Sequence, residues 1–283
     1  MIDTLRHLFE VGQHPLTPIG ADGPLLHFRT KIGQPVRGVL CRPDIAGRMP
    51  VVLVIHAHGD RYDIGCAELM DGRPALQSPL GPALAAMGIA SVCIDMPCFG
   101  SRADETESAA AKRLLWQGRS LAGQMVGECA AALDWLSEQD WVDSARIGVF
   151  GISMGATLGY WLAAVDGRVA VLAQECCLAD FAALIDSGAH DLHGIYLTIP
   201  GLLTVASNGQ IAGLIAPRAQ FIGIGDTDPL TPPMAADIAL DQVRAAYGAA
   251  GGRLVIHREP HSGHVETPAM RTGVLAFFAE TLA

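Results

Sequence analysis

A serine flanked by glycines, Gly151-Ile152-Ser153-Met154-Gly155, is the pattern in this chain that points most directly to chemistry. The apolar run 147–150 precedes it and the apolar run 156–163 follows, which predicts a strand, a sharp turn with serine at its tip, and a helix. Such a turn holds a nucleophilic serine in strained backbone angles, and the two glycines let strand and helix pass closely. The alternative is an ordinary strand-to-helix turn whose serine caps the helix. A nucleophilic role for Ser153 requires an acid and a histidine nearby.

Candidate partners for the serine follow two later strand-like runs. Asp226 and Asp228 come directly after the run 221–224, and three histidines follow the run 254–256: His257, His261 and His264. A serine hydroxyl attacks a carbonyl when an imidazole takes its proton and a carboxylate orients that imidazole. Functional residues of a parallel sheet lie in the loops at the carboxyl ends of its strands. The chain order serine, aspartate, histidine at such ends predicts a catalytic triad.

The elements that must position these residues form an alternating pattern. Short continuous apolar runs, typical of strands covered on both faces, alternate with helical patterns such as those at 76–87 and 121–136. The apolar runs are 51–56, 89–95, 147–150, 169–173, 221–224 and 254–256. Two alternating runs, 25–30 and 36–41, predict an antiparallel pair at a sheet edge. The sequence therefore predicts an α/β fold with about eight strands, mostly parallel, and helices on both faces.

The chain is expected to form a single domain over residues 1–283, because no linker or repeat divides it. Residues 178–217 are longer than an ordinary connection between strands, which predicts a small cap-like insertion. Within it, residues 194–217 carry no charge and include apolar side chains such as Tyr196. These side chains would favour a neutral, apolar substrate group if they face Ser153. The alternative is that they only pack the insertion onto the body.

Four motifs make the chain resemble the α/β-hydrolase superfamily, in its dienelactone-hydrolase and acetyl-xylan-esterase-like branch. They are His56-Ala57-His58-Gly59, the pentapeptide 151–155, the block 216–232 and Gly263-His264, and the segment 116–123 is also similar. The resemblance runs from about residue 36 onward. It differs from dienelactone hydrolases proper in having serine, not cysteine, as the nucleophile, which weakens any transfer of their lactone specificity.

The resemblance also implies roles for individual residues. It assigns the acid to Asp228, with Asp226 as the rival and Glu175 as a more remote one, and the base to His264. The amide of Met154, which follows the nucleophile, would stabilise the oxyanion. Asp60 would supply the second amide, because it follows the His-Gly of the family pattern.

Three further residues are assigned to substrate binding. Gly59 would let the backbone approach the substrate closely, and Phe99 and Tyr196 are expected to form part of the pocket wall.

Composition limits the partners. The chain carries a net charge of −10 and no basic run, which argues against nucleic acid or an anionic membrane. Its seven cysteines lack metal-type spacing and favour a reducing, cytoplasmic location. Neither a signal-peptide pattern nor an unbroken membrane span is visible. No nucleotide-binding loop or metal-ligand spacing is recognised either, so no cofactor and no metal are expected. The expected partner is a small molecule, and association between copies of the chain is left open.

Together these patterns predict a serine hydrolase that cleaves a carboxylic ester through an acyl-enzyme on Ser153. The same triad could cleave an amide, a peptide or a carbon–carbon bond, and a ligand-binding protein that keeps the fold without catalysis is a further alternative.

Overall fold

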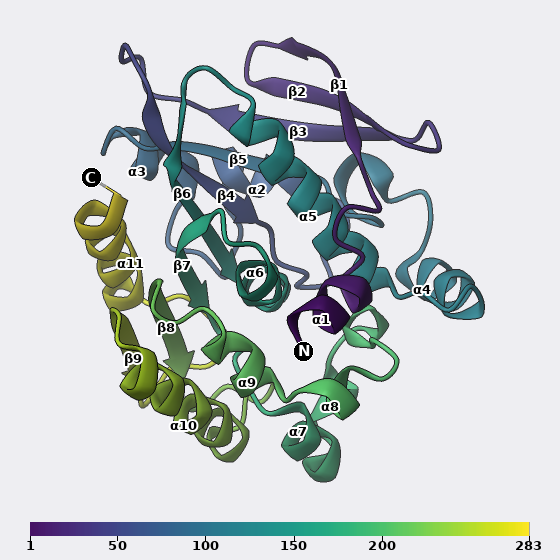
Figure 1. Ribbon diagram of the computed structural model, residues 1–283, viewed down its shortest axis with the longest axis vertical. Helices are drawn as coiled ribbons and strands as arrows, with labels where there is room; N and C mark the ends of the chain where they lie inside the picture. The colour runs from purple at the N-terminus through teal and green to yellow at the C-terminus, as the bar shows by residue number, and fades with distance from the viewer. Residues whose placement is uncertain (283) are drawn as a thin grey trace.

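The computed structural model describes residues 1–282, which form one sheet with helices on both faces (Figure 1). Within these residues the sheet has nine strands in the order β1-β2-β3-β5-β4-β6-β7-β8-β9. The strands are β1 (Leu16–Asp22), β2 (Leu25–Thr30), β3 (Pro35–Cys41), β4 (Met49–Ile55), β5 (Ala90–Ile94), β6 (Val142–Ile152), β7 (Val169–Glu175), β8 (Ala219–Gly225) and β9 (Leu254–Glu259). Pairing is antiparallel from β1 to β5 and parallel from β5 to β9. The predicted α/β class is confirmed.

The helices are α1 (Ile2–Leu8), α2 (Glu68–Asp71), α3 (Leu80–Ala85), α4 (Glu107–Trp116), α5 (Leu121–Ser137), α6 (Met154–Val165), α7 (Phe181–Ser187), α8 (Leu202–Val205), α9 (Asn208–Gly213), α10 (Pro233–Ala250) and α11 (Pro268–Leu282). Short 3₁₀ turns cover Gly65–Ala67, Gly100–Arg102, Ala189–Leu192 and Ile195–Leu197. None of these described helices combines the length and apolarity needed to cross a membrane.

Both faces of the sheet are buried, as the continuous apolar strands predict. In β4 the side chains of Val51, Leu53 and Ile55 join a core that includes α5 and α6. Those of Val52 and Val54 point to the other face and join a core that includes α3 and α11. A strand buried on both faces needs apolar residues at every position, and all seven residues of β4 are buried.

The sheet has one strand more than the eight predicted. The additional strand is β1, in which only Leu16 is buried, so it shows neither a continuous nor an alternating apolar pattern. The helix predicted over 76–87 is also shorter, since α3 begins at Leu80 after Pro79. The predicted helix over 121–136 is present as α5.

The segment 178–217 lies between β7 and β8 and holds α7, α8 and α9. Helix α9 packs against α10 and α6, and α8 packs against α1. In Figure 1, α7 and α8 lie at the opposite end of the molecule from the β1–β3 strands.

The parallel register brings the carboxyl ends of the strands to one edge. Ile55 of β4 pairs with Gly151 of β6, and Gly225 of β8 pairs with Glu259 of β9. The turns that follow β4, β6, β8 and β9 therefore meet, and these turns carry the candidate residues.

Candidate active site

Ser153 lies between the last residue of β6 and the first residue of α6, as the pentapeptide predicts. Its backbone angles are φ 58° and ψ −122°, a sparsely populated region that costs on the order of 1–3 kcal/mol for a residue with a side chain. Glycine is required on both sides of Ser153 because backbone atoms pass too close there for a side chain. A Cβ on Gly151 would overlap the Gly155 carbonyl, and a Cβ on Gly155 would overlap the Ile55 carbonyl oxygen. The turn thus presents the serine at the edge of the sheet.

The structure brings Ser153, His264 and Asp228 into one hydrogen-bonded chain. The Ser153 hydroxyl donates to His264 Nε2 at 2.8 Å, and His264 Nδ1 donates to Asp228 Oδ2 at 2.7 Å. The other Asp228 oxygen accepts the Leu230 N–H at 2.9 Å. The Asp228 side chain is buried and that of His264 is 22% exposed. This arrangement leaves the lone pair of Nε2 directed at the serine proton.

Asp226, the rival acid, has a different partner. Its Oδ1 accepts hydrogen bonds from the Arg258 guanidinium, with Nε at 2.8 Å and Nη2 at 2.6 Å. The alternative histidines also lie elsewhere: His257 bonds Glu259 at 2.9 Å, and His261 is exposed.

Glu175, the more remote rival, ends β7 beside the elbow, and its backbone carbonyl accepts the Ser153 N–H at 3.0 Å. Its carboxyl is buried, and neither oxygen has a hydrogen-bond partner among residues 1–282. Burial, together with the nearby Glu266, raises the pKa of Glu175 well above its ordinary value. A protonated carboxyl of this kind does not carry the negative charge that stabilises an imidazolium.

The two residues assigned to the oxyanion lie on different elements. Met154 begins α6, so its N–H has no acceptor within the helix and remains available. Asp60 and Gly59 both have φ 54°, and the Asp60 carboxylate is almost fully exposed. The Asp60 N–H donates to His58 Nδ1 at 3.1 Å. That amide can therefore bind an oxyanion only if it is shared with the imidazole or leaves it.

Phe99 and Tyr196, both assigned to the pocket wall, are buried in an aromatic cluster behind this loop. The Tyr196 ring stacks on His58 with centroids 5.3 Å apart, and Phe99 lies 5.1 Å from His58. Tyr62 stacks on Phe99 at 5.0 Å and also contacts His58 at 5.1 Å. The cluster thus joins the loop after β4 to the segment 178–217.

Sequence analysis missed two buried carboxylates that contact the loop after β4. Glu68 accepts the Ala57 N–H at 3.0 Å and pairs with the buried Arg73, and Glu107 accepts a hydrogen bond from His58 Nε2 at 2.5 Å. These acids stand 11 and 49 positions from their loop partners. Neither interval is a motif spacing, so no pattern in the sequence indicates the contacts.

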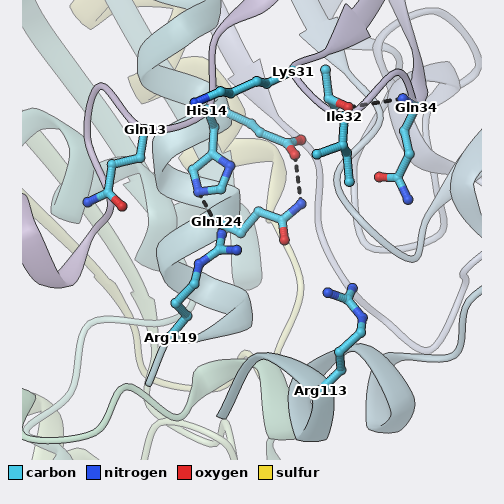
Figure 2. Close-up of a pocket in the computed structure, with 10 residues that line it drawn as sticks. Gln13, His14, Lys31, Ile32, Gln34, Arg113, Arg119 and Gln124 are labelled. Atoms are coloured by element: carbon cyan, nitrogen blue, oxygen red, sulfur yellow. Dashed lines mark hydrogen bonds between the residues drawn. The ribbon is translucent and has the colours of Figure 1, made fainter. Parts of the chain in front are cut away.

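A separate cavity of about 310 Å³ lies between the β2–β3 turn and α5, and none of the three triad residues lines it (Figure 2). Its residues are Gln13, His14, Thr30, Lys31, Ile32, Gln34, Arg113, Arg119, Gln124 and Glu128. Several polar groups here are paired within the protein: Arg119 with Glu10 at 2.6 Å, and Gln124 with Glu128 at 2.9 Å. No group of three or more metal-ligating side chains is found in residues 1–282.

The nine-stranded sheet, with its serine elbow between β6 and α6, defines an α/β-hydrolase. More particularly, the chain belongs to the X-Pro dipeptidyl-peptidase (S15) family, whose model matches residues 33–213. It is 35% identical over 240 residues to the Bacillus subtilis (strain 168) protein described as "Putative hydrolase YtaP", covering 83% of this chain and 80% of that protein. The predicted membership of the α/β-hydrolase superfamily is confirmed.

Solved structures share the fold at low identity. The acetyl xylan esterase from Paenibacillus sp. R4 superposes with a TM-score of 0.66 at 18% identity, covering 99% of this chain and 93% of that one. A glucuronoyl esterase from Solibacter usitatus superposes with a TM-score of 0.65 at 12% identity, covering 100% and 92%.

Proposed function

We propose that the protein is a serine carboxylesterase and that Ser153, His264 and Asp228 are its catalytic triad. The observation that carries the proposal is the continuous hydrogen-bonded chain from the serine hydroxyl through both imidazole nitrogens to a buried carboxylate. His264 takes the serine proton as Ser153 attacks the ester carbonyl, and Asp228 stabilises the imidazolium that forms. The alcohol leaves with a proton from His264. The imidazole then activates water, which hydrolyses the acyl-enzyme.

The tetrahedral intermediate requires amide donors that are already in place. Met154 is the first donor in this proposal, because its N–H is free at the start of α6. The second comes from the oxyanion loop, residues 58–61, and Asp60 is the candidate. In this proposal the Asp60 N–H stays bonded to His58 Nδ1 and is shared with the substrate oxygen as the negative charge develops.

In this proposal the chain forms a single domain, and the segment 178–217 is a cap over its active site. Its part from 194 to 217 carries no charged side chain, so it suits a neutral ester better than a charged one. Gly59 is assigned to the wall that faces the substrate, whereas Phe99 and Tyr196, predicted for the same wall, are buried and support the loop from behind. The esterase names of the structural relatives are consistent with an ester as the substrate class.

A peptidase reaction is the second candidate, and the description of the family favours it. Removing a dipeptide from a chain's amino terminus requires recognition of an ammonium group, for which a free carboxylate is the ordinary partner. Glu107, the buried carboxylate bonded to the oxyanion loop, already accepts three hydrogen bonds. Asp60 on the same loop does have an exposed carboxylate, so we place the ester first on the uncharged segment 194–217 and the esterase names of the structural relatives.

A substrate panel distinguishes the two. Wild type and Ser153→Ala are compared on p-nitrophenyl esters of graded acyl length and on p-nitroanilides of X-Pro dipeptides. The proposal predicts ester hydrolysis that disappears in Ser153→Ala, with anilide hydrolysis at least about a hundredfold slower. Faster cleavage of the anilides would instead make the enzyme a peptidase, and no hydrolysis of either class would favour the non-catalytic alternative.

The partner in this proposal is a small-molecule ester, and no further macromolecule is required. All seven cysteines are free, which is consistent with a reducing compartment such as the cytoplasm.

A further inference from the structure

Glu107 is a buried carboxylate at the first position of α4, outside the triad. Its side chain is only 6% exposed, yet its neighbour Glu105 lies on the surface and pairs with Arg113. A buried charge is retained only when hydrogen bonds compensate for the water it loses. The partners of Glu107 therefore show what the carboxylate organises.

Three donors from two separate segments converge on this carboxylate. Oε2 accepts from His58 Nε2 at 2.5 Å and from the Tyr62 hydroxyl at 2.9 Å, and Oε1 accepts the Tyr196 N–H at 2.8 Å. Burial alone would raise the pKa of Glu107, but these hydrogen bonds outweigh it and the pKa lies below its ordinary value. Glu107 is thus an anion that joins the loop after β4 to the segment 178–217.

On the loop side, His58 transmits the position of Glu107 to the oxyanion loop. Its Nδ1 accepts the Asp60 N–H at 3.1 Å, so the ring proton is on Nε2, where it is donated to Glu107. Both hydrogen bonds fix the plane of the imidazole. The ring in turn fixes the Asp60 amide.

On the other side, residues 193–196 are attached at two points. Tyr196 stacks on His58 and donates its amide to Glu107, while His193 Nε2 donates to the Leu230 carbonyl at 3.0 Å, two residues after Asp228. Between them Gly194 lies so close that a Cβ would be 2.6 Å from Glu107 Oε1. Residues 193–196 therefore connect the loop that carries Asp228 with the oxyanion loop.

We infer that Glu107 is a positioning residue that sets the oxyanion loop and residues 193–196 in a single arrangement. This inference rests on the proposed esterase function and assigns Glu107 no contact with the substrate. One carboxylate orders both the loop that supplies an oxyanion donor and residues 193–196 of the proposed cap. Its loss disturbs transition-state stabilisation and acyl-group binding together.

The test compares Glu107→Gln with wild type on p-nitrophenyl acetate and p-nitrophenyl hexanoate. Glutamine keeps the size of the side chain but has one acceptor oxygen for three donors, so the shared arrangement is lost. Rates are expressed per serine labelled by a fluorophosphonate, which removes the contribution of misfolded protein. Because a displaced donor weakens the oxyanion site, kcat is expected to fall at least about tenfold for both esters. KM is expected to rise more for the hexanoate than for the acetate.

The matched control is Glu105→Gln, which removes a partly exposed carboxylate two residues before α4 whose hydrogen-bond partner is Arg113. Its kcat and KM are expected to equal those of wild type. If Glu107→Gln does not fold, Gly194→Ala carries the test, because its added methyl group pushes residues 193–196 away from Glu107. It should lower kcat in the same way.

An unchanged kcat per labelled serine in the folded Glu107→Gln, or in Gly194→Ala, overturns the inference. A purely structural role would give that result, with only the labelled fraction reduced. Wild-type protein that neither hydrolyses these esters nor reacts with the probe would instead refute the proposed function.

Discussion

Replacing Asp228 by asparagine is expected to abolish most of the activity without changing the fold. The carboxylate oxygen lies 2.7 Å from His264 Nδ1 and fixes the ring proton there. An asparagine amide can donate to Nδ1 instead, which places the proton on Nε2 and turns an N–H toward Ser153. The serine then has no base. Holding the ring proton on the wrong imidazole nitrogen lowers the kcat of a serine hydrolase by about 10⁴-fold. At about 1.4 kcal/mol per factor of ten, this is about 5.5 kcal/mol of transition-state stabilisation.

The assay is the steady-state hydrolysis of p-nitrophenyl acetate, with circular dichroism to confirm folding. Asp226→Asn is the matched control, because it makes the same chemical change two residues away. Asp226 forms a partly exposed pair with Arg258, so its loss should cost at most about 1 kcal/mol of stability and leave kcat within about threefold of wild type. Activity lost in Asp226→Asn and kept in Asp228→Asn would refute the assignment of the acid.

Three further outcomes follow from the same structure. Gly155→Ala should destabilise the protein by about 3 kcal/mol or prevent folding, because its Cβ would overlap the Ile55 carbonyl; a melting temperature equal to that of wild type would contradict this. Glu175→Gln should leave kcat within about threefold of wild type, since burial keeps that carboxyl neutral; a loss comparable to Asp228→Asn would show that Glu175 carries a catalytic charge. Burial lowers the pKa of His56 to about 4, below its value in the unfolded chain. The contribution of His56 to the free energy of unfolding is therefore complete above about pH 6.5. It decreases by up to about 3 kcal/mol as the pH falls toward 4. Urea unfolding at about pH 7.5 and about pH 4.5 measures that decrease. The control variant His261→Asn, altered at an exposed histidine, should show the same decrease. Equal urea midpoints at the two pH values would contradict the prediction.

Strands with a strong local signal could be predicted from the sequence. Every residue of β4 is buried, so its pattern identifies it without knowledge of its neighbours. Strand β1 could not be found in this way, because six of its seven residues face solvent and its pairing with β2 holds it. Hydrophobic periodicity detects burial, and an exposed edge strand has little.

The candidate site likewise contains residues that a local sequence pattern predicts and residues that it does not. Ser153 lies in a local turn motif, whereas the choice between Asp226 and Asp228 depends on which of them faces His264 and which faces Arg258. That choice is set by tertiary contacts. Glu107 gave no signal at all, since its partner Tyr196 is 89 residues away along the chain.

The most direct test of the proposed triad is mass spectrometry of the protein after reaction with a fluorophosphonate probe, alongside ester hydrolysis. The proposal predicts one adduct, on the peptide that contains Ser153, and no adduct and no ester hydrolysis in Ser153→Ala. An adduct on another residue, or full ester hydrolysis by Ser153→Ala, would contradict the assignment of Ser153 as the nucleophile.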